Sequence, residues 1–168
     1  MAEAEARPPA ATLEPETEPF RAVGFMLSSL GHAVAGRFCA RIAPVGLEPK
    51  EFALLRAVGS REGDSQQAVG ERLGVPASRM VALVDELEGR RLLERRRSPR
   101  DRRAHALHLT PAGRKLLEQA TGLAASLERE LTQDLDAEER AELIALLDRV
   151  AVRLGVPPGV HGSQVVGG

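Results

Sequence analysis

The chain has 168 residues, a formal net charge of −1 and 43% hydrophobic residues, values that favour a single globular domain. Four Phe, no Trp and no Tyr disfavour the classes of protein that stack RNA or single-stranded bases on aromatic rings. The single cysteine, Cys39, excludes an internal disulfide, and no apolar run is long enough to span a membrane, so a cytoplasmic protein is expected. We find no metal-ligand spacing, phosphate-binding loop or catalytic constellation, and expect no cofactor, no metal and no enzyme.

The N-terminal part predicts a tail and two helices. Residues 1–19 are rich in Ala, Glu and Pro without periodicity, which predicts a disordered acidic tail. Apolar side chains recur at helical spacing over residues 20–43, and Pro44 ends that helix. A second helix is predicted to follow Glu48, with Pro49 at its first position and a buried side formed by three residues: Phe52, Leu55 and Val58.

The stretch from residue 65 to 110 predicts a helix, a tight turn, a second helix and a hairpin. Ser65 is expected to cap the first helix, Gly74 to provide the turn, and Pro76 to lie just inside the second helix. A single apolar stripe follows at i, i+3, i+4 and i+7: Met80, Leu83, Val84 and Leu87. This is the pattern of a helix-turn-helix, whose second helix enters the DNA major groove.

The predicted hairpin is strongly basic. Residues 90–103 hold eight arginines and two acids, a net charge of +6 in a chain that carries −1 overall. Ser98-Pro99 marks the turn, and the second strand alternates weakly, with Leu107 and Leu109 on one face. A concentration of arginine beside a helix-turn-helix favours a polyanionic partner, for which the DNA phosphates are the natural choice.

Five short motifs in this region carry a family resemblance: Leu73-Gly74-Val75, Leu83-Val84-Asp85-Glu86-Leu87-Glu88, Leu92-Leu93-Glu94-Arg95, Asp101-Arg102-Arg103 and Leu109-Thr110-Pro111-Ala112-Gly113-Arg114. Together they resemble the signature of the MarR family of bacterial transcriptional regulators, over roughly residues 20–154. The resemblance implies a winged-helix homodimer on pseudo-palindromic operators of double-stranded DNA. It also implies a repressor that a small-molecule effector or oxidation releases.

Two long helices are predicted after the hairpin. Thr110 is expected to cap a helix over residues 111–131 whose apolar face is Leu116, Leu117, Leu123 and Leu127. Asp136 caps the last helix, with Glu139 in the capping-box position. Its apolar stripe exceeds what one subunit is expected to cover: Leu143, Leu146, Leu147, Val150 and Leu154. Residues 128–148 carry a net charge of −6 and should not face DNA.

The predicted fold is therefore mainly α with a small β-wing. We expect one domain over residues 20–155, with a winged helix-turn-helix lobe at 47–110. The resemblance assigns dimerisation to the helices at 20–44 and 111–155. A second disordered tail is expected at 156–168, where the sequence is rich in glycine.

Arg79 is the residue we expect to read a base directly, because an Arg–guanine pair is bidentate. Val81 could meet a thymine methyl group, and Asp101 is expected to pair with a neighbouring arginine and orient the wing. Since Arg95, Arg96 and Arg97 alternate faces along a strand, two of the three are expected to face DNA. The complete set of predicted DNA contacts is Ser65, Gln66, Ala77, Ser78, Arg79, Val81, Arg95, Arg97, Arg100, Arg102 and Arg103.

Two other functions remain open. Val81 and Ala82 replace the polar residues common in the family, which would suit a protein-interaction module that has lost specific DNA binding. Cys39 would suit a redox-sensing regulator, although we expect a buried, inert thiol. The resemblance implies a small anionic aromatic ligand, and four residues could line its cleft: Phe25, Met26, His32 and Arg37.

Overall fold

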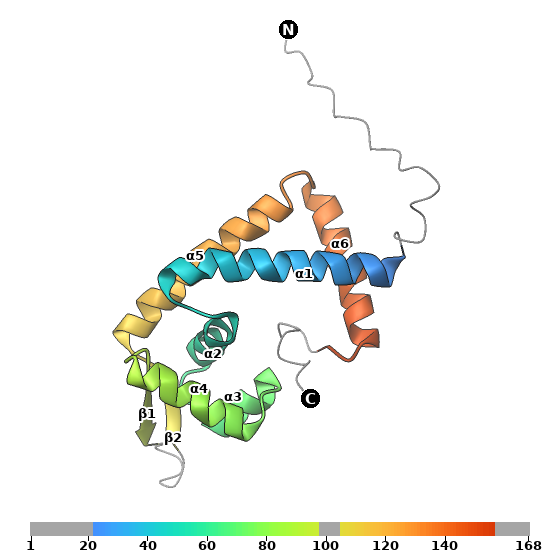
Figure 1. Cartoon of the computed structure of the whole chain (residues 1–168). Helices are drawn as coiled ribbons and strands as arrows, with labels where there is room; N and C mark the ends of the chain where they lie inside the picture. The colour runs from blue at the N-terminus through green and yellow to red at the C-terminus, as the bar shows by residue number, and fades with distance from the viewer. Residues whose placement is uncertain (1–21, 98–104, 157–168) are drawn as a thin grey trace. The chain divides into compact units, whose positions relative to one another are not determined.

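The computed structural model describes residues 22–97 and 105–156, so the two predicted tails lie outside the described residues, apart from Val156. In chain order the elements are α1 (Val23–Ile42), the short 3-10 helix η2 (Ala43–Val45), α2 (Pro49–Ser60), α3 (Gln66–Leu73), α4 (Ala77–Gly89), β1 (Leu93–Arg97), β2 (His105–Leu109), α5 (Pro111–Leu131) and α6 (Ala137–Arg153). This confirms a mainly helical winged-helix fold with one antiparallel strand pair (Figure 1). No helix in the described residues is long and apolar enough to cross a membrane.

The chain divides into two compact units, residues 1–36 and 37–168, and the boundary falls within α1. Of the first unit the structure describes the N-terminal part of α1, where Val23 and Leu30 are mostly exposed. The second unit contains the last residues of α1 and every later element. The apolar periodicity of α1 is therefore buried only near its end, at Phe38 and Ile42.

The helix starts agree with the local sequence. Glu48 and Glu51 form a reciprocal capping box at α2, in which the Glu48 N–H donates to Glu51 Oε2 at 2.7 Å. The Thr110 hydroxyl accepts from the Gly113 N–H at 3.0 Å and caps α5. Asp136 caps α6 by accepting from the Glu138 and Glu139 N–H groups, both at 2.9 Å. Each cap satisfies N–H groups that the first helical turn leaves without a partner.

The core of the second unit lies where α2, α3, α4 and the strand pair meet. It consists of aliphatic side chains that are almost completely buried: Leu54, Leu55, Val58, Val69, Met80, Val84, Leu87, Leu93 and Leu107. The predicted buried side of α2 is confirmed. The predicted apolar face of α5 is buried only in part. Leu127 is buried, whereas the other three leucines, Leu116, Leu117 and Leu123, are half-buried.

The apolar stripe of α6 stays exposed in the single chain. Its exposed hydrophobic side chains are between about two fifths and four fifths exposed: Leu143, Ile144, Leu146, Leu147 and Val152. Of the predicted stripe, Val150 is half-buried, and Leu154, the residue after the helix, is mostly exposed. No residue of α6 is buried. Residues 22–97 and 105–156 by themselves therefore do not cover the stripe.

Candidate nucleic-acid interface

The turn between α3 and α4 is fixed by backbone contacts. Ser65 Oγ accepts from the Ala68 N–H at 3.2 Å and caps α3 as predicted. Gly74 has φ +64°, the left-handed conformation that glycine adopts without steric cost. The Val75 N–H then donates to Gly70 O at 2.9 Å, which closes the helix end. These backbone contacts therefore determine the direction in which the chain enters α4 after α3.

Pro76 lies one residue outside α4, not inside it as predicted. Its ψ of 145° is extended, and it acts as the N-cap residue whose carbonyl accepts from Met80 N at 2.9 Å. The pattern still located the helix start, because the N–H that proline lacks is not used by the helix at the N-cap or at the first helical position.

Helix α4 has one buried and one exposed face. The predicted apolar stripe is confirmed, since Met80, Leu83, Val84 and Leu87 are all buried. The predicted DNA-facing residues of this helix are exposed: Ala77, Ser78, Arg79 and Val81. Arg79 is the only cation among the residues of α4, and Val81 is 45% exposed. The outward face of α4 thus offers one guanidinium beside a small apolar surface.

The strand pair is anchored to the helix-turn-helix by more than its own ladder. Strands β1 and β2 pair antiparallel, with Leu93 opposite Leu109 and Arg97 opposite His105. The segment before α3 pairs with β2 as well: the Gly63 N–H donates to Leu107 O at 3.1 Å, and an isolated bridge joins Ser65 to Ala106. The base of the wing and the start of α3 are therefore joined by backbone hydrogen bonds.

Glu62 fastens this piece to α5, a role that sequence reasoning missed. Its Oε1 accepts from the Leu109 N–H at 3.1 Å and its Oε2 from Arg114 Nη2 at 2.8 Å. The Arg114 hydrogen bond holds the pKa of Glu62 below its usual range against the opposing effect of burial, and the Leu109 N–H assists. His108 Nδ1 lies 3.8 Å from the same carboxylate. These contacts couple the wing base to the long helix.

The arginines of β1 have different surroundings. Arg95 binds Asp85 and Glu88 of α4 and Gln66 of α3, and its side chain is only 22% exposed. Burial lowers the pKa of Arg95, but the hydrogen bonds to Asp85 and Glu88 outweigh this effect and raise it. Arg96 pairs with Glu94 on the same strand. Arg97 is exposed, and no acid among the described residues forms an ion pair with it.

Two further arginines, both partly exposed, connect separate segments of the lobe. Arg90 Nη1 binds Glu51 Oε1 at 2.6 Å, where Glu51 is 2% exposed, and Arg90 Nη2 donates to Gly46 O at 2.7 Å. Arg72 Nη1 binds Asp64 at 2.5 Å and its Nη2 donates to Ala57 O. Sequence reasoning counted Arg90 with the basic hairpin and did not single out Arg72. Their acceptors lie between 8 and 44 residues away, beyond any local pattern.

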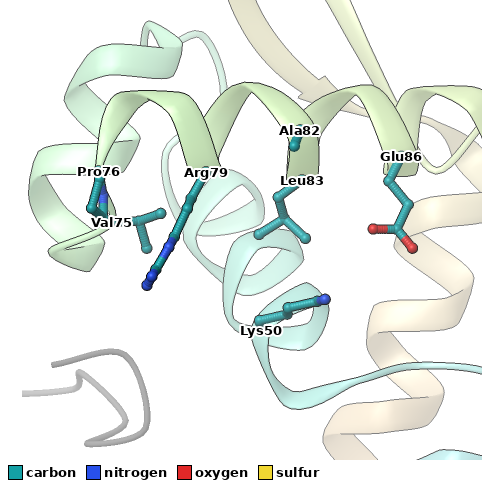
Figure 2. Close-up of a pocket in the computed structure, with 7 residues that line it drawn as sticks. All are labelled: Lys50, Val75, Pro76, Arg79, Ala82, Leu83 and Glu86. Atoms are coloured by element: carbon teal, nitrogen blue, oxygen red, sulfur yellow. The ribbon is translucent and has the colours of Figure 1, made fainter. Parts of the chain in front are cut away.

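A hollow of about 320 Å³ lies between α2 and α4. Figure 2 shows Lys50 of α2 facing Arg79, Leu83 and Glu86 of α4 across it. Lys50 Nζ is 2.9 Å from Glu48, and the hydrogen bond to Glu48 raises its pKa. The hollow adjoins the outward face of α4, so an occupant would contact the same helix that presents Arg79.

None of the four residues predicted for a ligand cleft lines this hollow. Phe25 and Met26 are nearly half exposed on α1, and His32 is exposed on the same helix. Arg37 is exposed and lies 3.8 Å from Glu130 of α5. Their role in a cleft stays a prediction.

The expectation of a buried Cys39 is wrong, because the thiol is exposed. Successive helical residues are rotated by about 100°, so the neighbour of the buried Phe38 points outward. The predicted wing-tip residues lie outside the described residues: Arg100, Asp101, Arg102 and Arg103. Within residues 22–97 and 105–156 no three His, Cys, Asp or Glu side chains gather as a metal site.

Comparison with known proteins adds to this geometry. A model of the MarR family matches residues 45–104. The chain is 32% identical over 105 residues to a transcriptional regulatory protein for the hcr operon of Thauera aromatica, a match that covers 62% of this chain and 63% of that protein. The chain thus spans slightly less than two thirds of that curated relative.

Two solved structures of the repressor CouR match over almost their whole length. CouR bound to a 23-mer DNA duplex has a TM-score of 0.72 and 34% identity, covering 84% of this chain and 99% of that one. CouR bound to p-coumaroyl-CoA has a TM-score of 0.68 and 33% identity, covering 83% and 97%. The likeness thus includes one structure with DNA and one with a small molecule.

Proposed function

We propose that this chain, which belongs to the MarR family of transcriptional regulators, is a homodimeric repressor that binds pseudo-palindromic operators in double-stranded DNA. The observation that carries the proposal is the outward face of α4, where Arg79 lies beside small exposed residues on a helix joined to β1 by the ion pairs of Arg95 with Asp85 and Glu88. Helices presented in this way enter the major groove. The similar repressor CouR has been solved on a DNA duplex, which supports the same use here.

In this proposal α4 reads bases and the hairpin holds the backbone and minor groove. Arg79 contacts a guanine and Val81 a thymine methyl group, while Ser65 and Gln66 lie at the start of α3 for phosphate contacts. The other proposed contacts are Ala77, Ser78, Arg97, Arg100, Arg102 and Arg103, with Asp101 orienting the wing. Arginine is suited to narrow A·T-rich minor grooves because their potential is strongly negative.

The homodimer is proposed from the exposed apolar stripe of α6. A stripe of leucine and isoleucine in water is unfavourable, and a second copy is the simplest cover for it. The division of the chain follows: residues 47–110 form the DNA-binding lobe, and residues 20–44 and 111–155 the dimerisation helices. Two lobes related by a two-fold axis would meet half-sites about one helical turn apart.

A small-molecule effector is proposed as the release signal. CouR has been solved with p-coumaroyl-CoA, so a relative of similar fold accommodates a small ligand. Phe25, Met26, His32 and Arg37 remain the proposed lining of a cleft. Ligands that bind only the free repressor would weaken operator affinity by linkage.

The first experiment is a binding titration against the intergenic DNA beside the gene, at several salt concentrations and with competitor duplex. We expect specific binding that weakens steeply with salt. The variant Arg79→Ala should lose about 1–3 kcal/mol of preference for the operator over random duplex. Replacing both Arg100 and Arg102 by Ala should lower affinity and flatten the salt dependence; unchanged binding would remove the wing assignment.

A second function, a winged-helix module that binds a protein partner, is favoured by one observation. Val81 is 45% exposed on α4 and cannot form a hydrogen bond with a base edge. The same titration separates the two functions. A protein-interaction module would bind every duplex equally weakly, and selection from random sequence would recover no preferred duplex.

A further inference from the structure

We propose that Arg95 is a positioning residue for DNA binding and does not itself contact DNA: it neutralises the carboxylates on the C-terminal half of α4 and braces β1 against α3 and α4. The inference rests on the proposed function. It replaces the role that the sequence pattern alone assigns to this arginine, which is a contact from the wing strand to DNA.

The donors of Arg95 are almost fully used inside the protein. A guanidinium has five N–H donors. Nε and Nη2 donate to Gln66 Oε1 at 3.3 and 3.1 Å, Nη2 also donates to Asp85 Oδ1 at 2.5 Å, and Nη1 donates to Glu88 Oε2. The backbone N–H of Arg95 is held as well, by Glu88 Oε1 at 3.0 Å. Only one N–H remains, whereas a bidentate phosphate contact needs two.

Asp85 is the reason that this neutralisation matters for DNA. It follows Ser78 and Val81 on α4 at spacings of seven and four residues, so it lies on the same helical face. Its side chain is 58% exposed, and that of Glu88 is 38% exposed. Without a cation beside them, the two carboxylates would extend the DNA-facing surface with negative charge and repel the phosphates.

Arg95 also sets the orientation of Gln66. A guanidinium can only donate, so the amide oxygen of Gln66 must face Arg95 and its NH₂ group must face away. An NH₂ group directed away from Arg95 can donate to a phosphate oxygen at the start of α3. Arg95 thereby neutralises the carboxylates of α4 and also orients the Gln66 amide at the start of α3.

The test is a set of variants measured against the duplex that selection from random sequence recovers with the wild-type protein. Arg95→Ala should weaken binding about tenfold or more, but less than about threefold in the Asp85→Asn, Glu88→Gln background, because the removed charges no longer need a partner. The slope of log affinity against log salt should stay within about half a unit of the wild type. The affinity of Arg95→Lys should lie between those of the wild type and Arg95→Ala, since an ammonium group keeps the charge but cannot reproduce the several hydrogen bonds of the guanidinium.

Arg97→Ala is the matched control, because it removes the same charge from an exposed position on the same strand. Its effect on affinity should be the same in both backgrounds. The proposal is overturned if Arg95→Ala lowers DNA affinity by the same factor in both backgrounds and the slope of log affinity against log salt becomes shallower by about one. That change of slope is the signature of a lost phosphate contact.

A measurement without DNA separates this inference from the proposed function. Urea unfolding should show that Arg95→Ala lowers the midpoint in the native background and much less in the Asp85→Asn, Glu88→Gln background. If Arg95→Ala lowered the urea midpoint by the same amount in both backgrounds, the stabilising contact of Arg95 with Asp85 and Glu88 would be refuted, even with operator binding intact. A wild-type protein that prefers no duplex would refute the proposed function, while coupled midpoints would still support the brace.

Discussion

Gly113→Ala should destabilise the fold because the backbone of Leu92 occupies the space that the new methyl group needs. A Cβ at position 113 would lie 2.0 Å from Leu92 O, and ordinary van der Waals contact begins at 3.4 Å, so the two must separate by about 1.4 Å. The Leu92 carbonyl cannot retreat freely, since it accepts from the Thr110 N–H at 3.1 Å and the Leu92 N–H donates to Leu87 O at 2.9 Å. We expect a loss of about 3 kcal/mol or more, against which the gain from alanine in a helix is about 0.5–1 kcal/mol.

Thermal unfolding at fixed protein concentration measures this effect, and the expected fall in Tm is about 6–12 °C for a chain of this size. Gly89→Ala is the control: it too lies in a helix, and a Cβ there would meet nothing within 4 Å. Its Tm should be unchanged or slightly raised. If Gly113→Ala melted within about 2 °C of the wild type, the close approach of α5 to Leu92 would be refuted.

Three other predictions follow from single contacts. Arg90→Ala leaves the Glu51 carboxylate buried without its ion partner and should cost about 2–3 kcal/mol in urea unfolding, whereas an unchanged midpoint would mean that the pair contributes nothing. The pKa of Glu62 is lowered, so its stabilisation is present above the unfolded-state pKa and is lost as pH falls through the folded-state pKa; the Tm gap between wild type and Glu62→Gln should therefore shrink in acid, and a constant gap would contradict this. Replacing Leu146 and Leu147 by Glu should convert the proposed dimer to a monomer in sedimentation, and a persistent dimer would place the interface elsewhere.

The sequence predicted the features that depend on neighbours in the chain. Ser65, Thr110 and Asp136 were identified as caps because a capping side chain and the backbone N–H that donates to it lie within three residues. The buried stripe of α4 was equally visible, since it needs only the helical period. The exposure of α6 was predicted by the same rule, which finds an apolar face without saying what covers it.

The partners of the arginines could not be predicted in this way. Arg95 binds residues 7, 10 and 29 positions away, and Glu62 binds Arg114 across 52 positions. Such pairs arise only when the fold brings α3, α4 and the wing together. Gly113 belongs to the same class: its motif is recognisable in the sequence, but its reason is the backbone of Leu92, which lies 21 residues earlier.

Pairing also changes what the charge of the hairpin means. Residues 90–103 carry +6, but extending the window to residue 85 adds three acids and lowers the net charge to +3. The structure shows why the longer window is the relevant one, since Arg95 binds two of those acids and Arg96 binds Glu94. The field that α4 and β1 present to a phosphate therefore comes chiefly from cations without an acidic partner among the described residues, of which Arg79 and Arg97 are the exposed examples. Arginine in this lobe has two uses, and only the ion-pair geometry distinguishes a residue that holds α4 in place from one left to meet DNA.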